Sequence, residues 1–195
     1  MIVKEFRFLD ANDPHDNTIL NWSRCYEWPW VMEKLNSLPG ILSIHNTCCG
    51  PGEIHKQFHD MLHKFSVDNS VRLINSDINE TPVNSKFDNF KIYDVTGIDK
   101  STHNVIICVS TLEEFASPEE QLGVIKNLFM QLRPGGRLLI TCDFPGVKLA
   151  ALEALLFQRC KGATTPLTGL SSIHKEWEYS GLNVIVLEIE KEYYV

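Results

Sequence analysis

The sequence predicts an α/β protein, a three-layer sandwich in which a mostly parallel β-sheet lies between layers of helices. Two observations predict this class. Short apolar runs alternate along the chain with segments of helical spacing, and the run "NVIICVS" (104–110) is apolar throughout, which is typical of a strand buried on both faces. The length of 195 residues, 44% of them hydrophobic, suffices for one sizeable core, so we expect a single domain over residues 1–195.

The first elements predicted along the chain are a helix, a strand and a second helix. The helix lies in "WPWVMEKLNSL" (28–38), with a proline near its start, after a polar segment (10–18) that predicts a loop or a mobile arm. The apolar run "ILSIH" (41–45) predicts a strand that leads into a Gly-Pro-Gly turn. After the turn, "GEIHKQFHDMLHKF" (52–65) carries apolar residues on one helical face, so we expect strand, tight turn and helix.

Further strands and helices alternate downstream. Beyond "NVIICVS", the predicted strands are "VRLIN" (71–75), "FKIYDV" (90–95), "RLLITCDF" (137–144) and "LNVIVLEIEKEYYV" (182–195). The helix "SPEEQLGVIKNLFMQL" (117–132) opens with a Ser-x-x-Glu capping box, and a turn at "RPGG" ends it. A further helix is expected in "VKLAALEALLFQRC" (147–160), followed by the loop "KGATTPLTG" (161–169).

Polar and glycine residues gather where the predicted strands end. Residues 46–52 follow the first of these strands, Asp77 the second, Asp94 the third and Ser110-Thr111 the fourth. Because the ligand crevice of an open parallel sheet lies beyond the carboxyl ends of its strands, these positions predict one shared site. The alternative is that strands simply end in polar turns.

The chemistry of these positions fits a nucleoside. Gly50 and Gly52 allow a ligand to approach the main chain and leave amides at the helix start free to donate. Asp77 is placed as the acid that accepts from a ribose diol, and Asp94 either accepts from an adenine amine or caps a turn. A dinucleotide fingerprint wants a third glycine where His55 stands, and no Gly-x-x-x-x-Gly-Lys-Ser/Thr loop exists, which disfavours NAD and ATP.

Four segments, in order and spacing, resemble class I S-adenosylmethionine-dependent methyltransferases. "IHNTCCGPG" (44–52) is similar to the family's first motif, an apolar strand followed by Asp-x-Gly-Cys-Gly-x-Gly, and "INSDIN" (74–79) to its second. "NVIICVSTLEEF" (104–115) resembles the fourth-strand motif, and "LFMQLRPGGRLLIT" (128–141) resembles the helix, turn and fifth strand that follow it. The similarity therefore runs from about Ile41 to Thr141, with a degenerate first motif.

The resemblance implies a Rossmann-like sandwich of about seven strands, the last antiparallel, with S-adenosylmethionine over the strand ends. We accordingly expect an N-terminal arm and helix (1–40), a cofactor-binding half (41–142) and a C-terminal substrate-side half (143–195). Carried over by position, the cofactor-binding residues are Asn46, Cys48, Gly50 and Gly52 at the methionine part, Asp77 at the ribose, Asp94 and Val95 at the adenine, and Ser110 and Thr111 at the sulfonium side. The implied activity is methyl transfer to a small-molecule or glycan-type acceptor.

Several residues depart from the family's pattern. Asn46 replaces the leading acid, Cys48 the first glycine, Asn104 an acid often found before the fourth strand, and Glu114 a histidine. Asn46 can form hydrogen bonds but brings no charge, and Cys48 is costly if its φ is positive. The alternative function is therefore a non-catalytic nucleoside-binding or interaction module on the same fold.

No catalytic base is assigned, because a base is needed only if the acceptor still holds its proton. The candidates near the crevice are His45, Glu113, Glu114, His174 and Glu176. The aromatic segment "SRCYEWPWVMEKL" (23–35) either closes over the cofactor, with Arg24 reaching its carboxylate, or packs its helix on the sheet. The loop 161–169 either helps to cover an acceptor or is an ordinary solvated loop.

His55, His59 and His63 recur every fourth residue, a spacing that can hold a metal. No carboxylate or cysteine obviously completes the set, so we predict a solvated helix flank and no metal site.

Composition narrows the partners. A formal net charge of −7 without a Lys/Arg cluster disfavours nucleic acid, and no apolar run has the length of a membrane span. The six cysteines include no Cys-x-x-Cys pair and predict reduced thiols, and the first residues lack a signal-peptide apolar region. We expect a cytoplasmic protein with a small-molecule partner; the oligomeric state stays open.

Overall fold

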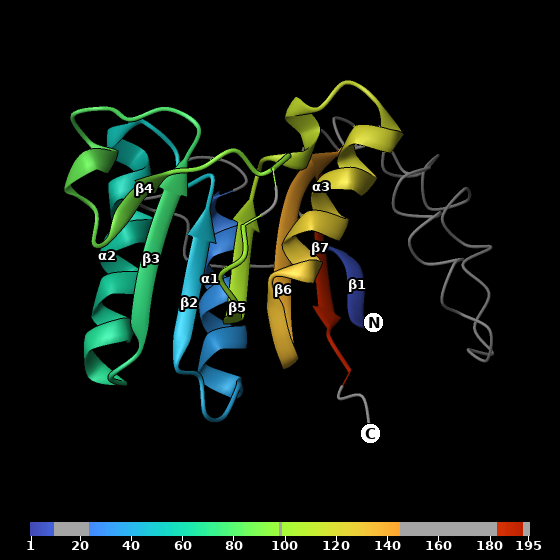
Figure 1. Ribbon diagram of the computed structural model, residues 1–195, viewed down its shortest axis with the longest axis horizontal. Helices are drawn as coiled ribbons and strands as arrows, with labels where there is room; N and C mark the ends of the chain where they lie inside the picture. The colour runs from blue at the N-terminus through green and yellow to red at the C-terminus, as the bar shows by residue number, and fades with distance from the viewer. Residues whose placement is uncertain (10–23, 98, 145–182, 193–195) are drawn as a thin grey trace.

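The computed structural model describes residues 1–9, 24–97, 99–144 and 183–192, which form a seven-stranded sheet with helices on both faces (Figure 1). The strands are β1 (Ile2–Leu9), β2 (Ser43–Thr47), β3 (Arg72–Asp77), β4 (Phe90–Ile92), β5 (His103–Val109), β6 (Leu132–Phe144) and β7 (Asn183–Glu190). The helices are α1 (Arg24–Ser37), α2 (Glu53–Asp68) and α3 (Pro118–Met130), with short 3-10 turns η1 (Asn84–Lys86) and η2 (Leu112–Glu114).

The strand order is β1-β7-β6-β5-β2-β3-β4. The pairs β2·β3, β2·β5, β3·β4 and β5·β6 are parallel, whereas β7 is antiparallel to both of its neighbours. The sheet is therefore mostly parallel with one antiparallel strand, which confirms the predicted class. The order changes direction between β2 and β5, and this switch point is where open α/β sheets bind their ligands.

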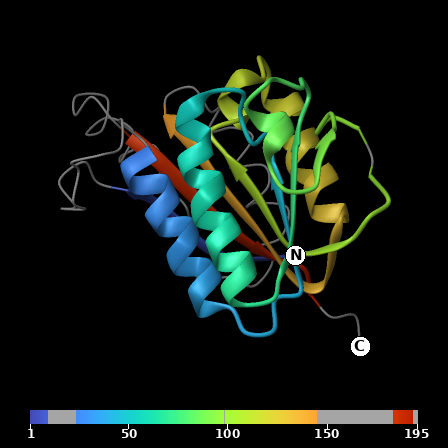
Figure 2. The same ribbon diagram turned by 90° about the vertical axis from the view of Figure 1, so that its left-hand side faces the viewer.

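Alternate residues of the central strands face two separate hydrophobic cores. In β5, Val105 and Ile107 belong to the core that also contains Trp28 of α1 and Phe58 of α2. Their neighbours Ile106 and Cys108 belong to a second core with residues of α3. Figure 2 shows α1 and α2 side by side on one face of the sheet and α3 on the other. Burial on both faces explains why this strand is apolar throughout.

The predicted capping box of α3 is confirmed, whereas the predicted start of α1 needs correction. Ser117 Oγ accepts from the Glu120 amide (3.2 Å), and the Glu120 carboxylate accepts from the Ser117 amide (3.1 Å), which confirms the capping box of α3. Helix α1 begins earlier than predicted, so Pro29 lies inside the helix and not near its start. The missing amide of Pro29 leaves one carbonyl of the preceding turn without its helical partner.

Three strand predictions need adjustment. Strand β2 is shifted by two residues to Ser43–Thr47, and β4 is only three residues long. The "RPGG" segment lies within β6 and is not a separate turn, because the Gly135 amide donates to the Lys191 carbonyl (2.6 Å) and the Lys191 amide to the Gly136 carbonyl (3.0 Å). These bonds tie the segment to the end of β7.

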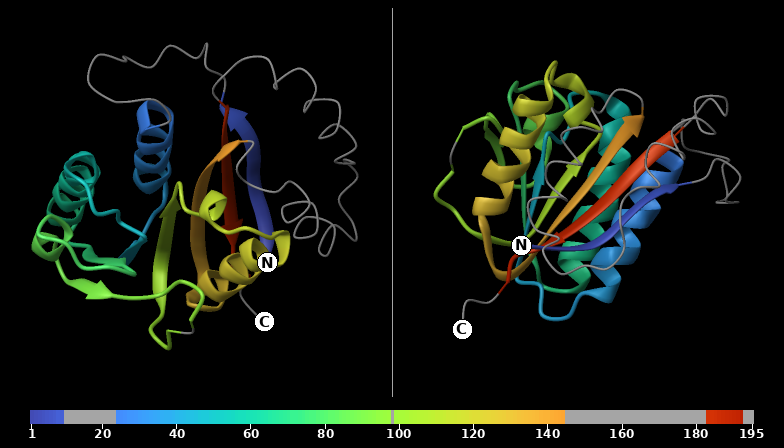
Figure 3. Two further views of the ribbon diagram at one scale, coloured as in Figure 1. Left: turned by 90° about the horizontal axis from the view of Figure 1, so that it is seen from above. Right: turned by 90° about the vertical axis from the view of Figure 1, so that its right-hand side faces the viewer.

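The N-terminal strand β1 was not predicted. It pairs antiparallel with β7 along its length and forms one edge of the sheet (Figure 3). Its sequence, "IVKEFRFL", mixes charged and apolar residues on both alternations, so the period-2 signal is weak. The chain before α1 therefore contributes to the sheet and is more than an arm.

Some predictions fall outside the described residues. They are the polar segment 10–18, the helix 147–160, the loop 161–169 and the base candidates His174 and Glu176. Within the described ranges, none of the helices has the length and apolar character that crossing a bilayer requires.

Candidate functional site

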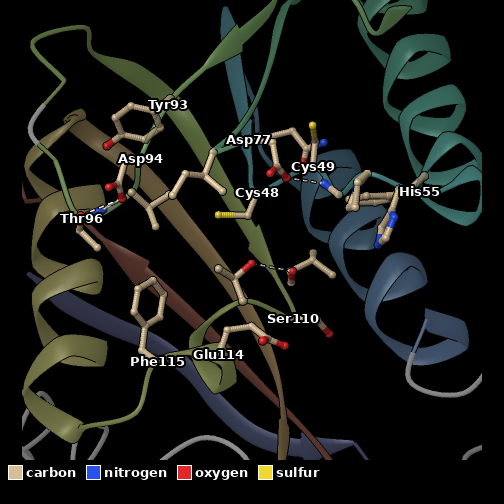
Figure 4. A pocket seen from close by; sticks show the side chains of 18 of the residues that line it. Cys48, Cys49, His55, Asp77, Tyr93, Asp94, Thr96, Ser110, Glu114 and Phe115 are labelled. Atoms are coloured by element: carbon tan, nitrogen blue, oxygen red, sulfur yellow. Dashed lines mark hydrogen bonds between the residues drawn. The ribbon is translucent and has the colours of Figure 1, made fainter. Parts of the chain in front are cut away.

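A pocket of about 500 Å³ opens at the carboxyl ends of β2, β3, β4 and β5, at the switch point. All of the predicted cofactor residues except Gly52 line it: Asn46, Cys48, Gly50, Asp77, Asp94, Val95, Ser110 and Thr111. Figure 4 shows His55 on one side of the pocket, Tyr93 and Asp94 on the opposite side, and Glu114 and Phe115 along a third side. Four strand ends far apart in the sequence thus meet in one cavity of the size that small ligands occupy.

The turn after β2 is fixed by hydrogen bonds within the protein. The Cys49 amide donates to the Ser76 carbonyl (2.9 Å), the Gly50 amide to Asp77 Oδ2 (2.9 Å), and the Gly52 amide to His55 Nδ1 (3.2 Å). These three turn amides therefore have partners within the protein, whereas the expectation of free amides concerned the start of α2, which follows the turn. Asp77 and His55 instead hold the turn in shape, and Gly52 caps α2 without lining the pocket.

Gly50 has the backbone conformation that favours glycine. Its φ is +80°, and a Cβ at this position would lie 2.5 Å from Cδ2 of His55. The histidine ring thus occupies the space that a side chain would need. The third position of the turn motif, where a glycine would permit close packing, is filled by an imidazole that packs on the turn.

Cys48 also has a positive φ, +52°. For a residue with a Cβ the left-handed region costs about 1–2 kcal/mol. The Cys48 thiol lies beside Cys108 and Thr111; the hydrogen bond to Cys108, and then burial, raise the pKa of the Cys48 thiol far above its usual value. The side chain is therefore a neutral thiol on the pocket wall, at a position where the backbone is strained. Cys48, Cys49, Cys108 and Cys142 are all free thiols.

The side-chain amide of Asn46 spends part of its hydrogen-bonding capacity inside the sheet. Its Nδ2 donates to Asn75 Oδ1 (3.0 Å), and the Asn75 side chain donates to the Asp88 carbonyl (2.8 Å). Asn46 and Asn75 are register partners on β2 and β3, which places their amides side by side. Asn46 reaches the pocket as a buried neutral amide, so this position supplies no charge to a ligand.

The two acids that were predicted to contact a nucleoside differ in their partners. Asp77 accepts from the Gly50 amide through Oδ2 and from the Asn79 amide through Oδ1 (3.3 Å), which leaves acceptor capacity on both oxygens. Asp94 is exposed, and Oδ1 accepts from the amide (2.8 Å) and hydroxyl (2.7 Å) of Thr96. These bonds lower the pKa of Asp94. Asp94 therefore caps a turn and also lines the pocket, and its contact with an adenine amine stays a prediction.

The sequence reasoning missed a buried carboxylate beside the pocket. Glu27 of α1 is completely buried, and its carboxylate accepts from Ser110 Oγ (2.7 Å) and Thr141 Oγ1 (2.5 Å). Arg24 forms an ion pair with Glu27 and donates to Ser110 Oγ. Ser110 has φ +44°, which turns its hydroxyl toward this group. An acid between Tyr26 and Trp28, in the middle of an aromatic segment, was the available signal.

The candidate bases lie in different places. Glu114 lines the pocket and is exposed. Glu113 points away from the pocket lining toward the end of β6, where its Oε1 accepts from the Asp143 amide (3.2 Å). Burial, and then the negative charges of Asp143 and Glu27, raise the pKa of Glu113 to about 7. Among the described residues its Oε2 has no hydrogen-bond partner.

His45 does not reach the pocket. It is completely buried on β2, and Nε2 shares a hydrogen bond with Ser76 Oγ (2.8 Å). Burial, and then the charge of Lys91, lower the pKa of His45 to about 3, so it is neutral and unsuited to act as a base at the strand ends.

The three histidines of α2 serve different contacts. His55 folds over the glycine turn, whereas His59 Nε2 accepts from the Asp88 amide (3.1 Å) and His63 pairs with the Asp88 carboxylate. His59 also stacks on Phe87, with ring centroids 4.3 Å apart. These contacts bind α2 to the segment before β4, so the regularly spaced histidines of α2 have a structural role.

Comparison with known proteins gives structural matches only. The sequence matches no family model and no curated protein. Similar solved structures include an S-adenosylmethionine-dependent methyltransferase from Archaeoglobus fulgidus, with TM-score 0.53 and 11% identity over 83% of this chain and 91% of that chain. The plantazolicin methyltransferase BpumL in complex with S-adenosylhomocysteine has TM-score 0.52 and 15% identity over 85% and 82%.

Two other similar structures are a cyclase and a sugar N-methyltransferase. The cyclase SpnF has TM-score 0.52 and 12% identity over 84% of this chain and 81% of that chain. The sugar N-methyltransferase KedS8 from Streptoalloteichus has TM-score 0.46 and 16% identity over 58% of this chain, and the match spans only about half (46%) of that protein. The described strands and helices of this chain have the fold of the class I S-adenosylmethionine-dependent methyltransferases.

Proposed function

We propose that this protein is an S-adenosylmethionine-dependent methyltransferase that acts on a small-molecule or glycan-type acceptor. The observation that carries the proposal is the pocket at the switch point, in which the strand-end residues carried over from the family's motifs lie together around about 500 Å³. The fold alone does not establish the reaction, because one similar structure is a cyclase. The argument therefore rests on the pocket residues.

The nucleoside half of the pocket fits an adenosine. Asp77 retains acceptor capacity on both oxygens, as a ribose diol requires, although Gly50 and Asn79 already donate to it. Asp94 and the buried Val95 line the far side, where Asp94 can accept from an exocyclic amine. These residues would hold the adenosine part of S-adenosylmethionine.

The methionine half has one cation and one buried acid. Arg24 lines the pocket while paired with Glu27, so a fixed carboxylate orients the guanidinium, which is proposed to face the carboxylate of the ligand. Asn46 contributes no charge, so Arg24 is the principal charged residue proposed for this half.

When bound, S-adenosylmethionine supplies a methyl group activated by positive sulfur. Under this proposal the chain itself aligns the methyl donor with the acceptor and excludes water. Ser110 and Thr111 lie at the end of β5, where the sulfonium side is proposed to face. Glu114, exposed at the rim, is the described residue best placed to accept a proton from an acceptor.

A cytoplasmic location and a small-molecule partner, without nucleic acid or membrane, belong to the same proposal and rest on the net charge of −7 and the free thiols.

A second candidate is a non-catalytic nucleoside-binding or interaction module. Two observations favour it: the neutral Asn46 in place of an acid, already bonded to Asn75, and the strained backbone at Cys48. Both would lower affinity for the cofactor without affecting the fold.

Calorimetric titration with S-adenosylhomocysteine tests the cofactor part of the proposal. We expect wild-type binding, and a loss of about tenfold to a hundredfold in Asp77→Ala, because this change removes the ribose acceptor and the partner of the Gly50 amide. The matched control is Asp68→Ala, which removes an exposed carboxylate paired with Lys64 at the end of α2 and should leave affinity unchanged.

Absence of binding of either S-adenosylmethionine or S-adenosylhomocysteine at millimolar concentration would overturn the proposal. Binding without methyl transfer across a panel of amine, hydroxyl and sugar acceptors would favour the non-catalytic module.

A further inference from the structure

A second depression, of about 510 Å³, lies at the opposite edge of the sheet. Strands β2, β3 and β5 begin here with Ser43, Arg72 and His103, whereas the cofactor pocket lies where these strands end. Figure 1 shows that β2, β3 and β5 run in the same direction, so the strand starts that line this depression lie at one edge of the sheet. Lys91 and Arg133 also line it. The two cavities are therefore separated by the length of the strands.

Cations dominate the depression. Arg72, Lys91 and Arg133 line it, and Asp99 is the only acid among the described residues that line it. Asp99 forms an ion pair with Lys91. Although burial alone would raise the pKa of Asp99, hydrogen bonds from Lys91 and from the Ser101 amide hold it well below its usual range. The carboxylate is therefore fully charged and already neutralises the lysine.

The two arginines have no such partner. Among the described residues no carboxylate forms an ion pair with Arg72 or Arg133, and Arg133 Nε makes only a long bond to Thr102 Oγ1 (3.4 Å). Both arginines line the same depression, Arg72 from β3 and Arg133 from β6 with β5 and β2 between these strands, and an anion between the two positive charges would be stabilised by both. Each guanidinium offers several N–H donors in a planar fork that matches the oxygens of phosphate.

A buried histidine supplies an independent observation. His103 lines the depression and is only 2% exposed. Its Nε2 shares a hydrogen bond with Ser101 Oγ (3.1 Å), whereas Nδ1 is buried and has no partner among the described residues. Burial, and then the charge of Lys91, lower the pKa of His103 to about 4, so the ring is neutral at neutral pH. A buried polar atom without a partner costs about 1–3 kcal/mol, so His103 is an unsatisfied polar residue in the lining of this depression.

We propose that this depression is a binding site for the phosphoryl group of a small anionic molecule, held between Arg72 and Arg133 with Lys91, Ser101 and His103 beneath. The hydroxyl and guanidinium donors outnumber what a single carboxylate can accept, so phosphate is the better match. The chain as a whole is acidic, at −7, so attraction comes from this local group of cations and not from the overall charge. The site is independent of the cofactor pocket.

Titration with inorganic phosphate, followed by calorimetry at constant ionic strength, tests the proposal. We expect saturable binding in the millimolar range for the wild type, and similar binding of glycerol 2-phosphate if a phosphate ester is accepted. The double variant Arg72→Gln/Arg133→Gln should bind phosphate at least about tenfold more weakly, because two charge-assisted contacts are lost. Both arginines are exposed, so the fold should tolerate the change.

The matched control is Lys64→Gln/Lys126→Gln, which removes the same charge from exposed positions on α2 and α3. This control should bind phosphate as the wild type does. Equal weakening in both double variants, or binding of acetate as tight as phosphate, would overturn the proposal, as would the absence of saturable binding. S-adenosylhomocysteine titration of the same variants should give wild-type affinity, so failure here is distinguishable from failure of the proposed methyltransferase function.

Discussion

The two ends of the parallel strands carry similar turns that differ in what surrounds them. We call the end where β2, β3 and β5 finish the carboxyl edge of the sheet, and the end where they begin the amino edge. At the carboxyl edge, Gly50 has φ +80° and a Cβ there would collide with His55; at the amino edge, Gly40 has φ +68° and a Cβ would meet nothing within 4 Å. The carboxyl edge collects acids, with Glu27 fully buried, whereas the amino edge collects cations around His103. The same local backbone thus serves a crowded turn beside the pocket on one edge and an uncrowded change of direction on the other.

The largest expected effect comes from substituting the two glycines of this comparison. Gly50→Ala should lower the affinity for S-adenosylhomocysteine by about a hundredfold or more, because the new Cβ displaces the His55 ring and reshapes the pocket wall. Gly40→Ala carries the same left-handed penalty of about 1 kcal/mol but no collision, so it should lower the free energy of unfolding slightly and leave affinity unchanged. Calorimetry and thermal melts on both variants measure the difference. Equal affinity in the two variants would mean that the Gly50 turn does not contact the ligand.

A second prediction concerns the buried acid of the carboxyl edge. Glu27→Gln should lower the free energy of unfolding by about 3 kcal/mol, because the buried ion pair with Arg24 loses its negative charge. The matched control is Glu33→Gln on the same helix, where the side chain is exposed and the expected change is below about 0.5 kcal/mol. Denaturant unfolding of the two variants decides whether Glu27 holds α1 to the strand ends; similar values would show that it does not.

The two edges should also respond oppositely to pH. The raised pKa of Glu113, about 7, means that the folded state keeps a proton that the unfolded state releases above its ordinary pKa of 4.5. Its stabilising contribution is therefore present below about pH 4.5 and is lost as pH rises through about 7. The lowered pKa of His103, about 4, has the opposite sign: its contribution is present above about pH 6.5 and is lost as pH falls toward 4.

Glu113→Gln isolates the carboxyl-edge part of this dependence. At about pH 8 the variant should be more stable than the wild type by about 1–3 kcal/mol, because the buried charge is gone, and at about pH 5 the two should be nearly equal. Unfolding by denaturant at both pH values measures the gap. A gap that does not change with pH would show that Glu113 does not titrate in this range.

Features of the carboxyl edge that follow from chain order could be predicted from the sequence. Parallel strands end at one edge, so Asp77, Asp94 and Ser110 were expected to meet, and the pocket brings them together. The capping box of α3 was also predictable, because both of its partners lie within four residues. Local signals and strand direction were sufficient in these cases.

Contacts that depend on register or on tertiary packing could not be predicted. The bond between Asn46 and Asn75 requires the alignment of β2 with β3, and Glu27 meets Thr141 across 114 positions of the chain. The folding of His55 onto Gly50 depends on a rotamer that spacing does not specify. The edge strand β1 was missed because its alternation is weak and its stability comes from pairing with β7.

The smallest expected effect concerns the sign of φ at Cys48, which the sequence left open. Cys48→Gly relieves the left-handed strain at φ +52° but removes a side chain that packs against the second hydrophobic core, the one that contains residues of α3. The free energy of unfolding should therefore change by less than about 1 kcal/mol. Ser70→Gly is the matched control: φ is +55° in an exposed turn at the amino edge, so relief of strain alone should stabilise by up to about 1 kcal/mol. If the thiol merely crowds the pocket, Cys48→Gly should bind S-adenosylhomocysteine severalfold more tightly while Ser70→Gly does not. Weaker binding in Cys48→Gly would instead assign the thiol a contact with the ligand, and the departure from the family's glycine would then be a feature of recognition.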